Sequence, residues 1–103
     1  MEPGAIVLTE AAVEHSPAAP GVYFLYRADQ LTYIGLAEQD EGIRDAVENH
    51  RSGMCAGCTQ QATGFTYELT HQSRRRHAQH LRAYRERHDG HVPPCNECQP
   101  CGS

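Results

Sequence analysis

The sequence predicts an α/β domain: a small, mostly antiparallel sheet of three strands flanked by helices, in the order strand, strand, helix, strand, helix. Two runs rich in β-branched and aromatic residues, 21–26 and 31–36, lie close enough to pair as a hairpin. A third run, Phe65–Leu69, alternates apolar and polar side chains as a half-buried strand does. The stretches 40–50 and 73–88 have apolar residues at helical spacing. A chain of 103 residues has room for one such core.

The first part of the chain, residues 1–20, is expected to lead into the sheet through a short helix. Thr9 can cap that helix, which would run to about His15. Pro17 and Pro20 end it, because a residue that precedes proline avoids the helical conformation.

The predicted hairpin decides where its two central tyrosines point. The break between its strands covers about three residues, 28–30. A three-residue loop would place Tyr23 and Tyr33 on the same face of the sheet, whereas a two-residue loop would place them on opposite faces. The sequence leaves both arrangements open.

The helix after the hairpin begins at Asp40 or Glu41 and ends at Gly53. Its apolar positions share one face, and a histidine follows at the next turn: Ile43, Ala46, Val47 and His50.

The last helix is predicted from about Ser73 to His88. Leu81 and Tyr84 would point inward, with the arginines mainly on the outer side. Asp89-Gly90 ends this helix, since glycine readily adopts the left-handed conformation of a helix C-terminus.

The basic residues are concentrated although the chain as a whole carries a net charge of −4. All nine are arginine, and six of them fall between Arg74 and Arg87. Because salt screens charges beyond about 10 Å, a local stripe of arginines can contact phosphates whatever the total charge. We expect four arginines to contact DNA: Arg74, Arg75, Arg76 and Arg82.

The N-terminus and the hydropathy of the chain predict a cytoplasmic protein that does not associate with a membrane. No apolar run approaches the roughly 20 residues that cross a bilayer. Met1-Glu2-Pro3-Gly4 lacks the basic start of a signal peptide. In a reducing compartment, clustered cysteines indicate a metal or redox site more often than disulfides.

The five cysteines form two motifs with the spacing of metal ligands, Cys55-x-x-Cys58 and Cys95-x-x-Cys98-x-x-Cys101. Two such turns supply four thiolates for a tetrahedral zinc site, for which Cys55, Cys58, Cys95 and Cys98 are the preferred ligands and Cys101 can replace one. The site would brace the C-terminal tail, residues 93–103, against a small core. An iron–sulfur cluster and a disulfide pair are the alternatives.

Two tripeptides at hairpin spacing, Gly21-Val22-Tyr23 and Tyr33-Ile34-Gly35, resemble the paired signature of the GIY-YIG nucleases. Further matches are Ile43-Arg44, His50 and Pro94-Cys95-Asn96, which resembles the family's closing Pro-x-Asn. The resemblance covers roughly residues 18–97 and extends to a small bacterial subgroup of such domains.

The resemblance implies metal-assisted hydrolysis of a phosphodiester, with Mg²⁺ or Mn²⁺ as the cation. It assigns to Tyr23 the deprotonation of the attacking water, with Tyr33 beside it and His50 contributing to the site. Asn96 corresponds to the family's asparagine, or it is a turn residue after the prolines. The family also uses an arginine of the first helix and a metal-binding glutamate of the second, since a phosphoryl transition state needs cationic support.

The family's arginine and its metal-binding glutamate have no clear counterparts in this chain. The family's arginine precedes the helix histidine by four residues, where this chain has Ala46. Arg44 is two residues away and therefore about 200° around the helix, so it either substitutes for that arginine or corresponds to the family's less critical upstream arginine. His77 occupies the place of the glutamate, and imidazole is a poor ligand for Mg²⁺. Either the metal has changed or hydrolysis has been lost.

Two functions of different classes follow. In the first, the chain is a GIY-YIG-type domain that acts on DNA, either as an endonuclease or as a degenerate descendant that only binds nucleic acid. In the second, it is a structural or sensor module in which a metal site of four cysteines is the working part and no hydrolysis takes place.

Overall fold

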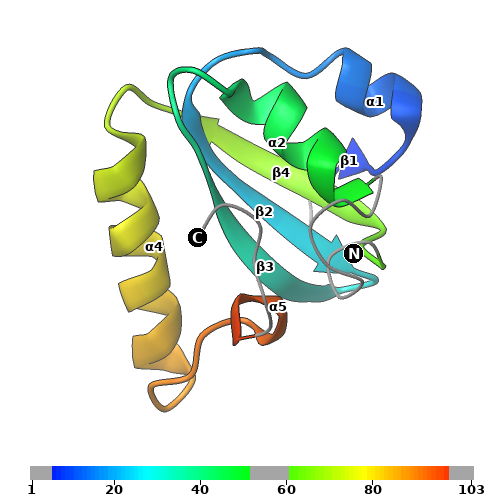
Figure 1. Cartoon of the computed structure of the whole chain (residues 1–103). Coiled ribbons are helices and arrows are strands. Elements are labelled where there is room, and N and C mark those ends of the chain that lie inside the picture. The colour runs from blue at the N-terminus through cyan, green and yellow to red at the C-terminus, as the bar shows by residue number, and fades with distance from the viewer. Residues whose placement is uncertain (1–5, 52–60, 98–103) are drawn as a thin grey trace.

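A computed structural model of the chain describes residues 6–51 and 61–97. The elements follow in the order β1 (Ile6–Val7), α1 (Glu10–Glu14), β2 (Gly21–Arg27), β3 (Gln30–Ala37), α2 (Gly42–Arg51), β4 (Gly64–Leu69), α4 (Ser73–Arg87) and α5 (Pro94–Glu97). The strands make one antiparallel sheet in the order β1-β4-β2-β3 (Figure 1). None of the helices in these two ranges is long and apolar enough to cross a membrane.

The predicted α/β class is confirmed, but the prediction of three strands is wrong. A fourth strand, β1, pairs with β4 through Ile6 opposite Phe65 and Val7 opposite Gly64. Two residues are too few to produce an alternating pattern, so no local signal indicates this strand. The sheet is also antiparallel throughout, rather than mostly so.

The β2–β3 hairpin combines a two-residue turn with a bulge. Arg27 pairs with Gln30 across the turn, and the register then shifts so that Leu25 pairs with Tyr33. The extra residue in β3 is Thr32, whose hydroxyl donates to the carbonyl of Leu25 over 3.2 Å. A two-residue turn alone would have put Tyr23 and Tyr33 on opposite faces, and the bulge returns them to the same face.

The two faces of the sheet are covered by different helices (Figure 1). The face that carries Tyr23 packs against α1 and α2, and the main core lies there. Successive side chains of a strand point to opposite faces, and Phe24 contacts α4 on the other side through His80, with ring centroids 5.0 Å apart. The core cluster comprises Val13, Tyr23, Leu25, Tyr33, Ala37, Ile43, Ala46, Val47, Phe65 and Cys95.

Helices α1 and α2 are joined by hydrogen bonds near their ends. Thr9 caps α1 as predicted, its hydroxyl accepting from the amide of Ala12 over 3.1 Å. Helix α2 begins at Gly42, slightly later than predicted. Gly42 has a φ of +83°, and a Cβ there would lie 2.8 Å from the carbonyl carbon of Ala18. The amide of Ile43 then donates to the Ala19 carbonyl, which fixes the approach of the two segments.

Helix α4 ends close to the predicted position. Asp89 and Gly90 have left-handed φ values of +54° and +85°, and the amide of Gly90 donates to the Arg85 carbonyl over 2.7 Å. Leu81 and Tyr84 are half-buried against the sheet, consistent with their predicted inward direction. The predicted end of the other long helix at Gly53 lies outside the described residues.

Gly35 gives a test of how the hairpin is packed. A Cβ at this position would lie 2.1 Å from Cζ of Tyr23, the residue paired with it across the strands. Gly35→Ala should therefore lower the free energy of unfolding by about 1–3 kcal/mol, as overpacking of a core does. Chemical denaturation measures the change.

The control for that prediction is the same substitution in a Tyr23→Leu background, where the shorter side chain leaves room for the added methyl group. The cost of Gly35→Ala should be clearly smaller there. An equal cost in both backgrounds would mean that contact with the Tyr23 ring is not what requires glycine.

Candidate functional site

Three aromatic side chains meet beneath α2. The hydroxyl of Tyr23 and Nε2 of His50 are 2.7 Å apart, in a hydrogen bond whose donor depends on the histidine tautomer. The ring of Tyr33 lies beside both, with centroids 6.0 Å from Tyr23 and 4.8 Å from His50. All three residues are buried, and the most exposed of them, Tyr33, is 4% exposed. We call these residues the Tyr–His cluster.

Each member of the cluster is held by a different local feature. Tyr23 and Tyr33 share a face because of the bulge at Thr32. His50 lies in the last turn of α2, on the face that also buries Ile43, Ala46 and Val47. The absence of a side chain at Gly35 leaves the space that the Tyr23 ring fills. The predicted proximity of these three residues is therefore seen in the structure.

Burial keeps the whole cluster uncharged near neutral pH. It raises the pKa of Tyr23 well above its ordinary value, and the neighbouring Tyr33 and Glu41 raise it further. Burial also raises the pKa of Tyr33 to about 12. It lowers the pKa of His50 to about 4. These directions disfavour a tyrosinate–imidazolium pair, because both charged forms would lose hydration.

The cluster opens onto a cavity of about 250 Å³. Its lining residues are Tyr23, Leu36, Glu38, Asp40, Glu41, Ala46, Asn49 and His50. The three carboxylates come from the loop between β3 and α2, and the sequence reasoning did not select them. The signal was present as an acidic run, residues 38–41, directly after the second signature tripeptide.

The pKa of the Glu41 carboxyl indicates that the surroundings of this cavity are negatively charged. Partial burial raises this pKa, and the nearby Asp40, Asp45 and Glu38 raise it further. The amide of Asn49 donates to Oε2 of Glu41 over 3.5 Å. Ala46, at the position of the family's arginine, faces the same cavity and is 3% exposed. Among the described residues that line this cavity there is no arginine.

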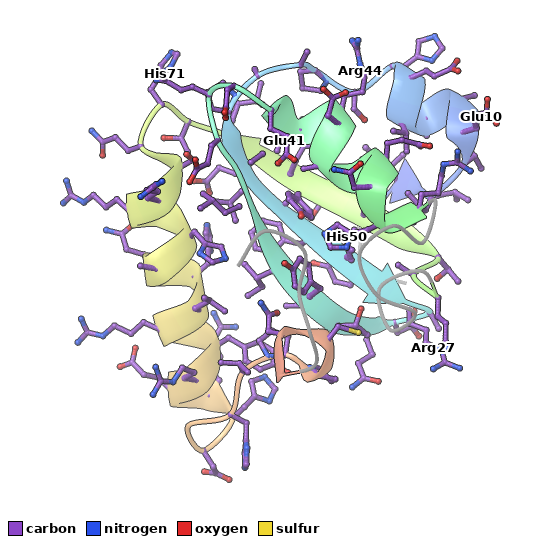
Figure 2. All side chains as sticks on the ribbon, viewed as in Figure 1. Glu10, Arg27, Glu41, Arg44, His50 and His71 are labelled. Atoms are coloured by element: carbon purple, nitrogen blue, oxygen red, sulfur yellow. The ribbon has the colours of Figure 1, made fainter. Side chains whose placement is uncertain are left out.

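Arg44 lies outside the Tyr–His cluster. Its side chain is on the outer side of α2, and its Nε donates to the Ser16 carbonyl over 3.0 Å. Figure 2 shows Arg44 directed away from the sheet, while His50 lies between α2 and the strands. The helical rotation of about 200° between positions 44 and 46 explains the difference.

His77 and Asn96 meet at one residue, Ile34, on the free edge of the sheet. Asn96 pairs with it as a neighbouring strand would: its Oδ1 accepts from the amide of Ile34 over 2.9 Å, and its Nδ2 donates to the carbonyl over 3.0 Å. His77 Nε2 is 3.1 Å from that same carbonyl. Both predicted catalytic residues therefore bind the backbone of the second signature tripeptide, and Asn96 covers the exposed edge of β3.

Two of the four arginines expected to contact DNA are held by carboxylates. Arg74 lies 2.7 Å from Glu38, and Arg76 forms two hydrogen bonds, of 2.6 and 3.0 Å, with Glu68. The bonds from Arg76 lower the pKa of the Glu68 carboxyl to about 2. Arg75 and Arg82 are exposed.

Of the predicted metal ligands, only Cys95 lies among the described residues, since Cys55, Cys58, Cys98 and Cys101 do not. Cys95 is 3% exposed, belongs to the core cluster and is disulfide-bonded. A sulfur in a disulfide is not a thiolate and does not ligate zinc. The state of Cys95 thus matches the disulfide alternative, and zinc stays a prediction. No group of three or more His, Cys, Asp or Glu within residues 6–51 and 61–97 is arranged to hold a metal ion.

Comparisons of the chain with protein-family models, curated proteins and solved structures found no match. The resemblance to the GIY-YIG nucleases therefore depends on the residues themselves.

The buried histidine predicts a pH dependence of stability. Unfolded His50 takes up a proton as the pH falls below about 6.5, whereas the folded protein resists protonation down to about 4. The unfolded state thus binds more protons between these values, and the free energy of unfolding should fall by up to about 3 kcal/mol on acidification across them. His77, whose pKa burial also lowers, adds to the same trend. Denaturant unfolding at pH 7.5 and pH 5 measures the loss.

The matched variant for that measurement is His50→Gln, which has no titrating group. Its free energy of unfolding should change less between the two pH values than that of the wild type. An unchanged dependence would show that the acid sensitivity has another origin.

The contact of Asn96 with Ile34 predicts how well the edge of the sheet is protected. Asn96→Ala removes both hydrogen bonds and should lower the free energy of unfolding by about 1–3 kcal/mol. It should also raise the exchange rate of the Ile34 amide hydrogen more than that of amides in the central strand β2, which serve as an internal reference. NMR-detected hydrogen exchange measures both, and equal changes at Ile34 and in β2 would contradict a local role.

Proposed function

We propose that this chain is a nucleic-acid-binding domain of the GIY-YIG type whose hydrolytic site has lost the groups that stabilise a phosphoryl transition state. The observation that carries the proposal is the lining of the cavity beside the Tyr23–His50 hydrogen bond. That lining includes Ala46 and three carboxylates, Glu41 among them, where a nuclease needs a cation.

The retained pair by itself is a poor base. Burial disfavours both the tyrosinate and the imidazolium, and the neighbouring Glu41 raises the pKa of Tyr23 further. An adjacent arginine or metal would shift these equilibria the other way, because opposite charges favour the ionised form. With Ala46 in place of the arginine, the cluster serves packing: it fixes α2 to the sheet.

The metal that the resemblance implies, Mg²⁺ or Mn²⁺, has no fitting site among the described residues, since the three carboxylates that line the cavity do not form a group arranged to hold a metal ion. Both cations prefer oxygen ligands, and the carboxylate expected on α4 is replaced by His77. The Nε2 of that imidazole is already hydrogen-bonded to the backbone of Ile34. We therefore derive no hydrolytic step through a metal at this site.

The support for nucleic acid as partner comes from α4. The outer side of this helix carries Arg82 and Arg85, both exposed and without an ion pair to any described residue, and they lie within one turn of each other. Side chains at this spacing can contact successive phosphates of one strand. The acidic residues that line the cavity, Glu38, Asp40 and Glu41, lie in the loop between β3 and α2 and not on this helix.

The proposal predicts binding to DNA without cleavage. Supercoiled plasmid incubated with the protein and Mg²⁺, Mn²⁺ or Zn²⁺ should stay uncut, while fluorescence anisotropy should detect salt-dependent binding to a short oligonucleotide. Nicking that disappears in Tyr23→Phe would contradict the loss of hydrolysis. A complete lack of binding at low salt would contradict the nucleic-acid function.

The salt dependence identifies the residues that bind. In Arg82→Gln/Arg85→Gln the slope of log K against log salt should decrease in magnitude by roughly 1.4–1.8, since each lost phosphate contact removes about 0.7–0.9. The matched control is Arg27→Gln, which removes one exposed arginine at the far end of β2 (Figure 2). An equal effect per arginine removed would indicate attraction by total charge alone.

A further inference from the structure

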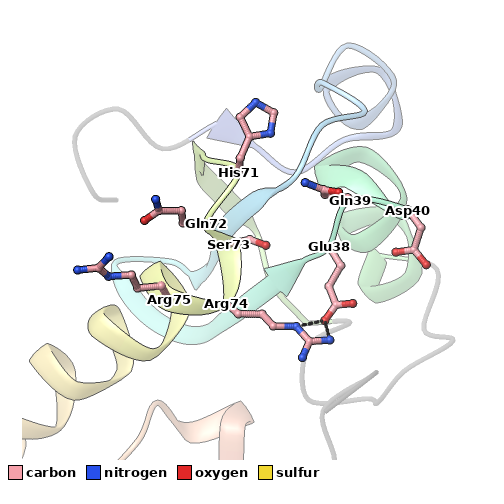
Figure 3. A pocket seen from close by; sticks show the side chains of 8 residues that line it. All are labelled: Glu38, Gln39, Asp40, His71, Gln72, Ser73, Arg74 and Arg75. Atoms are coloured by element: carbon pink, nitrogen blue, oxygen red, sulfur yellow. Dashed lines mark hydrogen bonds and ion pairs between the residues drawn. The ribbon is translucent and has the colours of Figure 1, made fainter.

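A second hollow lies at the start of α4, next to the cavity of the Tyr–His cluster. Its volume is about 520 Å³. It lies between the loop that follows β3 and the first turn of α4 (Figure 3). The residues that line it are Glu38, Gln39, Asp40, His71, Gln72, Ser73, Arg74 and Arg75. Nothing in the proposed function uses this hollow, which we call the α4 hollow.

The first turn of α4 presents backbone donors to the α4 hollow. The hydrogen-bond ladder of the helix starts with the amide of Arg76, which donates to the Gln72 carbonyl. Gln72, the N-cap residue, makes no side-chain capping bond, and the first turn contains no acidic residue. The preceding amides of the helix lie before this ladder, at the positive end of the helix dipole, where they have no partner within the helix. Such a terminus favours an anion.

Ser73 adds a side-chain donor that has no other use in the fold. The residue is 6% exposed, yet among the described residues its hydroxyl has no hydrogen-bond partner. In Figure 3 its oxygen points into the hollow, towards the loop that carries Glu38. No fully buried side-chain oxygen or nitrogen of the described residues lacks a hydrogen-bond partner, so the Ser73 oxygen is open to the hollow and accessible to a ligand there. A ligand that accepts a hydrogen bond would satisfy it.

The charges of the first turn point to the same class of ligand. Three consecutive arginines follow Ser73, although the dipole disfavours positive charge at this end of a helix. Arg74 is held by Glu38 at 2.7 Å and Arg76 by Glu68 at 2.6 Å. Arg75 is exposed and has no ion pair with any described residue. An anion at the helix end would supply the missing partner of Arg75.

We propose that the α4 hollow binds a phosphate group. The backbone amides at the start of α4, the Ser73 hydroxyl and the Arg75 guanidinium donate to its oxygens, while the Arg74–Glu38 pair closes one side. A phosphate offers several acceptor oxygens, so backbone and side-chain donors can bind it at the same time. The acceptor is either the end of an oligonucleotide or an internal phosphodiester. Binding here is independent of hydrolysis at the Tyr–His cluster.

The test is an NMR titration of the ¹⁵N-labelled full chain with inorganic phosphate, against chloride at the same ionic strength. Phosphate should produce saturable shifts of the amides of residues 73–75 that chloride does not reproduce. Ser73→Ala and Arg75→Gln should each weaken phosphate binding about fivefold, the equivalent of one hydrogen bond. Arg27→Gln, a matched loss of an exposed arginine at the far end of β2, should change it by less than about twofold, because it lies beyond the reach of one phosphate. The remaining amide resonances report whether each variant is folded.

Two results would overturn the proposal: no saturable shift at residues 73–75, or equal weakening by Arg27→Gln and Arg75→Gln. A second titration, with oligonucleotides that carry a 5′-phosphate or a 5′-hydroxyl, identifies the source of the phosphate. If the oligonucleotide with a 5′-phosphate binds more tightly than the one with a 5′-hydroxyl, and Ser73→Ala removes this difference, the site binds a terminal phosphate. If both oligonucleotides bind equally and Ser73→Ala weakens both, the site binds an internal phosphodiester. If phosphate does not bind in the α4 hollow, the effect of Arg82→Gln/Arg85→Gln on the salt dependence of DNA binding is still expected. The two proposals can therefore be contradicted independently.

Discussion

The hydrogen bond between Tyr23 and His50 connects the two layers of the main core, and much of the structure is arranged around it. The bond spans 2.7 Å in a buried environment, where an unpaired hydroxyl or imidazole would cost more than either contributes when paired. It requires a glycine at position 35, because any larger residue would occupy the space of the Tyr23 ring. The bulge at Thr32 then brings Tyr33 to the same face. The packing of the main core and the presence of the signature residues Tyr23, Tyr33 and Gly35 are thus both related to this hydrogen bond.

The free edge of the sheet is closed by side chains rather than by another strand. Asn96 satisfies both backbone groups of Ile34, and His77 approaches the same carbonyl from α4. An uncovered edge is a template for association with other chains. The residues that the family resemblance assigns to chemistry therefore have a structural use here.

The loop from Glu38 to Glu41 separates two hollows of opposite character. On one side its carboxylates surround the Tyr–His cluster and raise the pKa of Glu41. On the other side Glu38 is neutralised by Arg74, next to the positive end of α4. Both hollows are lined by Glu38 and Asp40, so the proposed phosphate site depends on donors close to the ligand and not on the net charge of −4.

The sequence by itself determined the three longer strands and the helices α1, α2 and α4, since alternation and helical spacing of apolar residues are local properties. The resemblance carried by Gly21-Val22-Tyr23 and Tyr33-Ile34-Gly35 also pointed to the residues that meet under α2, but the sequence left open whether the two tyrosines share a face. Strand β1 is too short to leave a pattern, and the bulge at Thr32 depends on pairing across the hairpin. Only the tertiary structure decided that Arg44 points outward, that Asn96 binds Ile34 and that Ser73 faces a hollow. Each of these depends on contacts between residues far apart in the chain, and local spacing carries no information about such contacts.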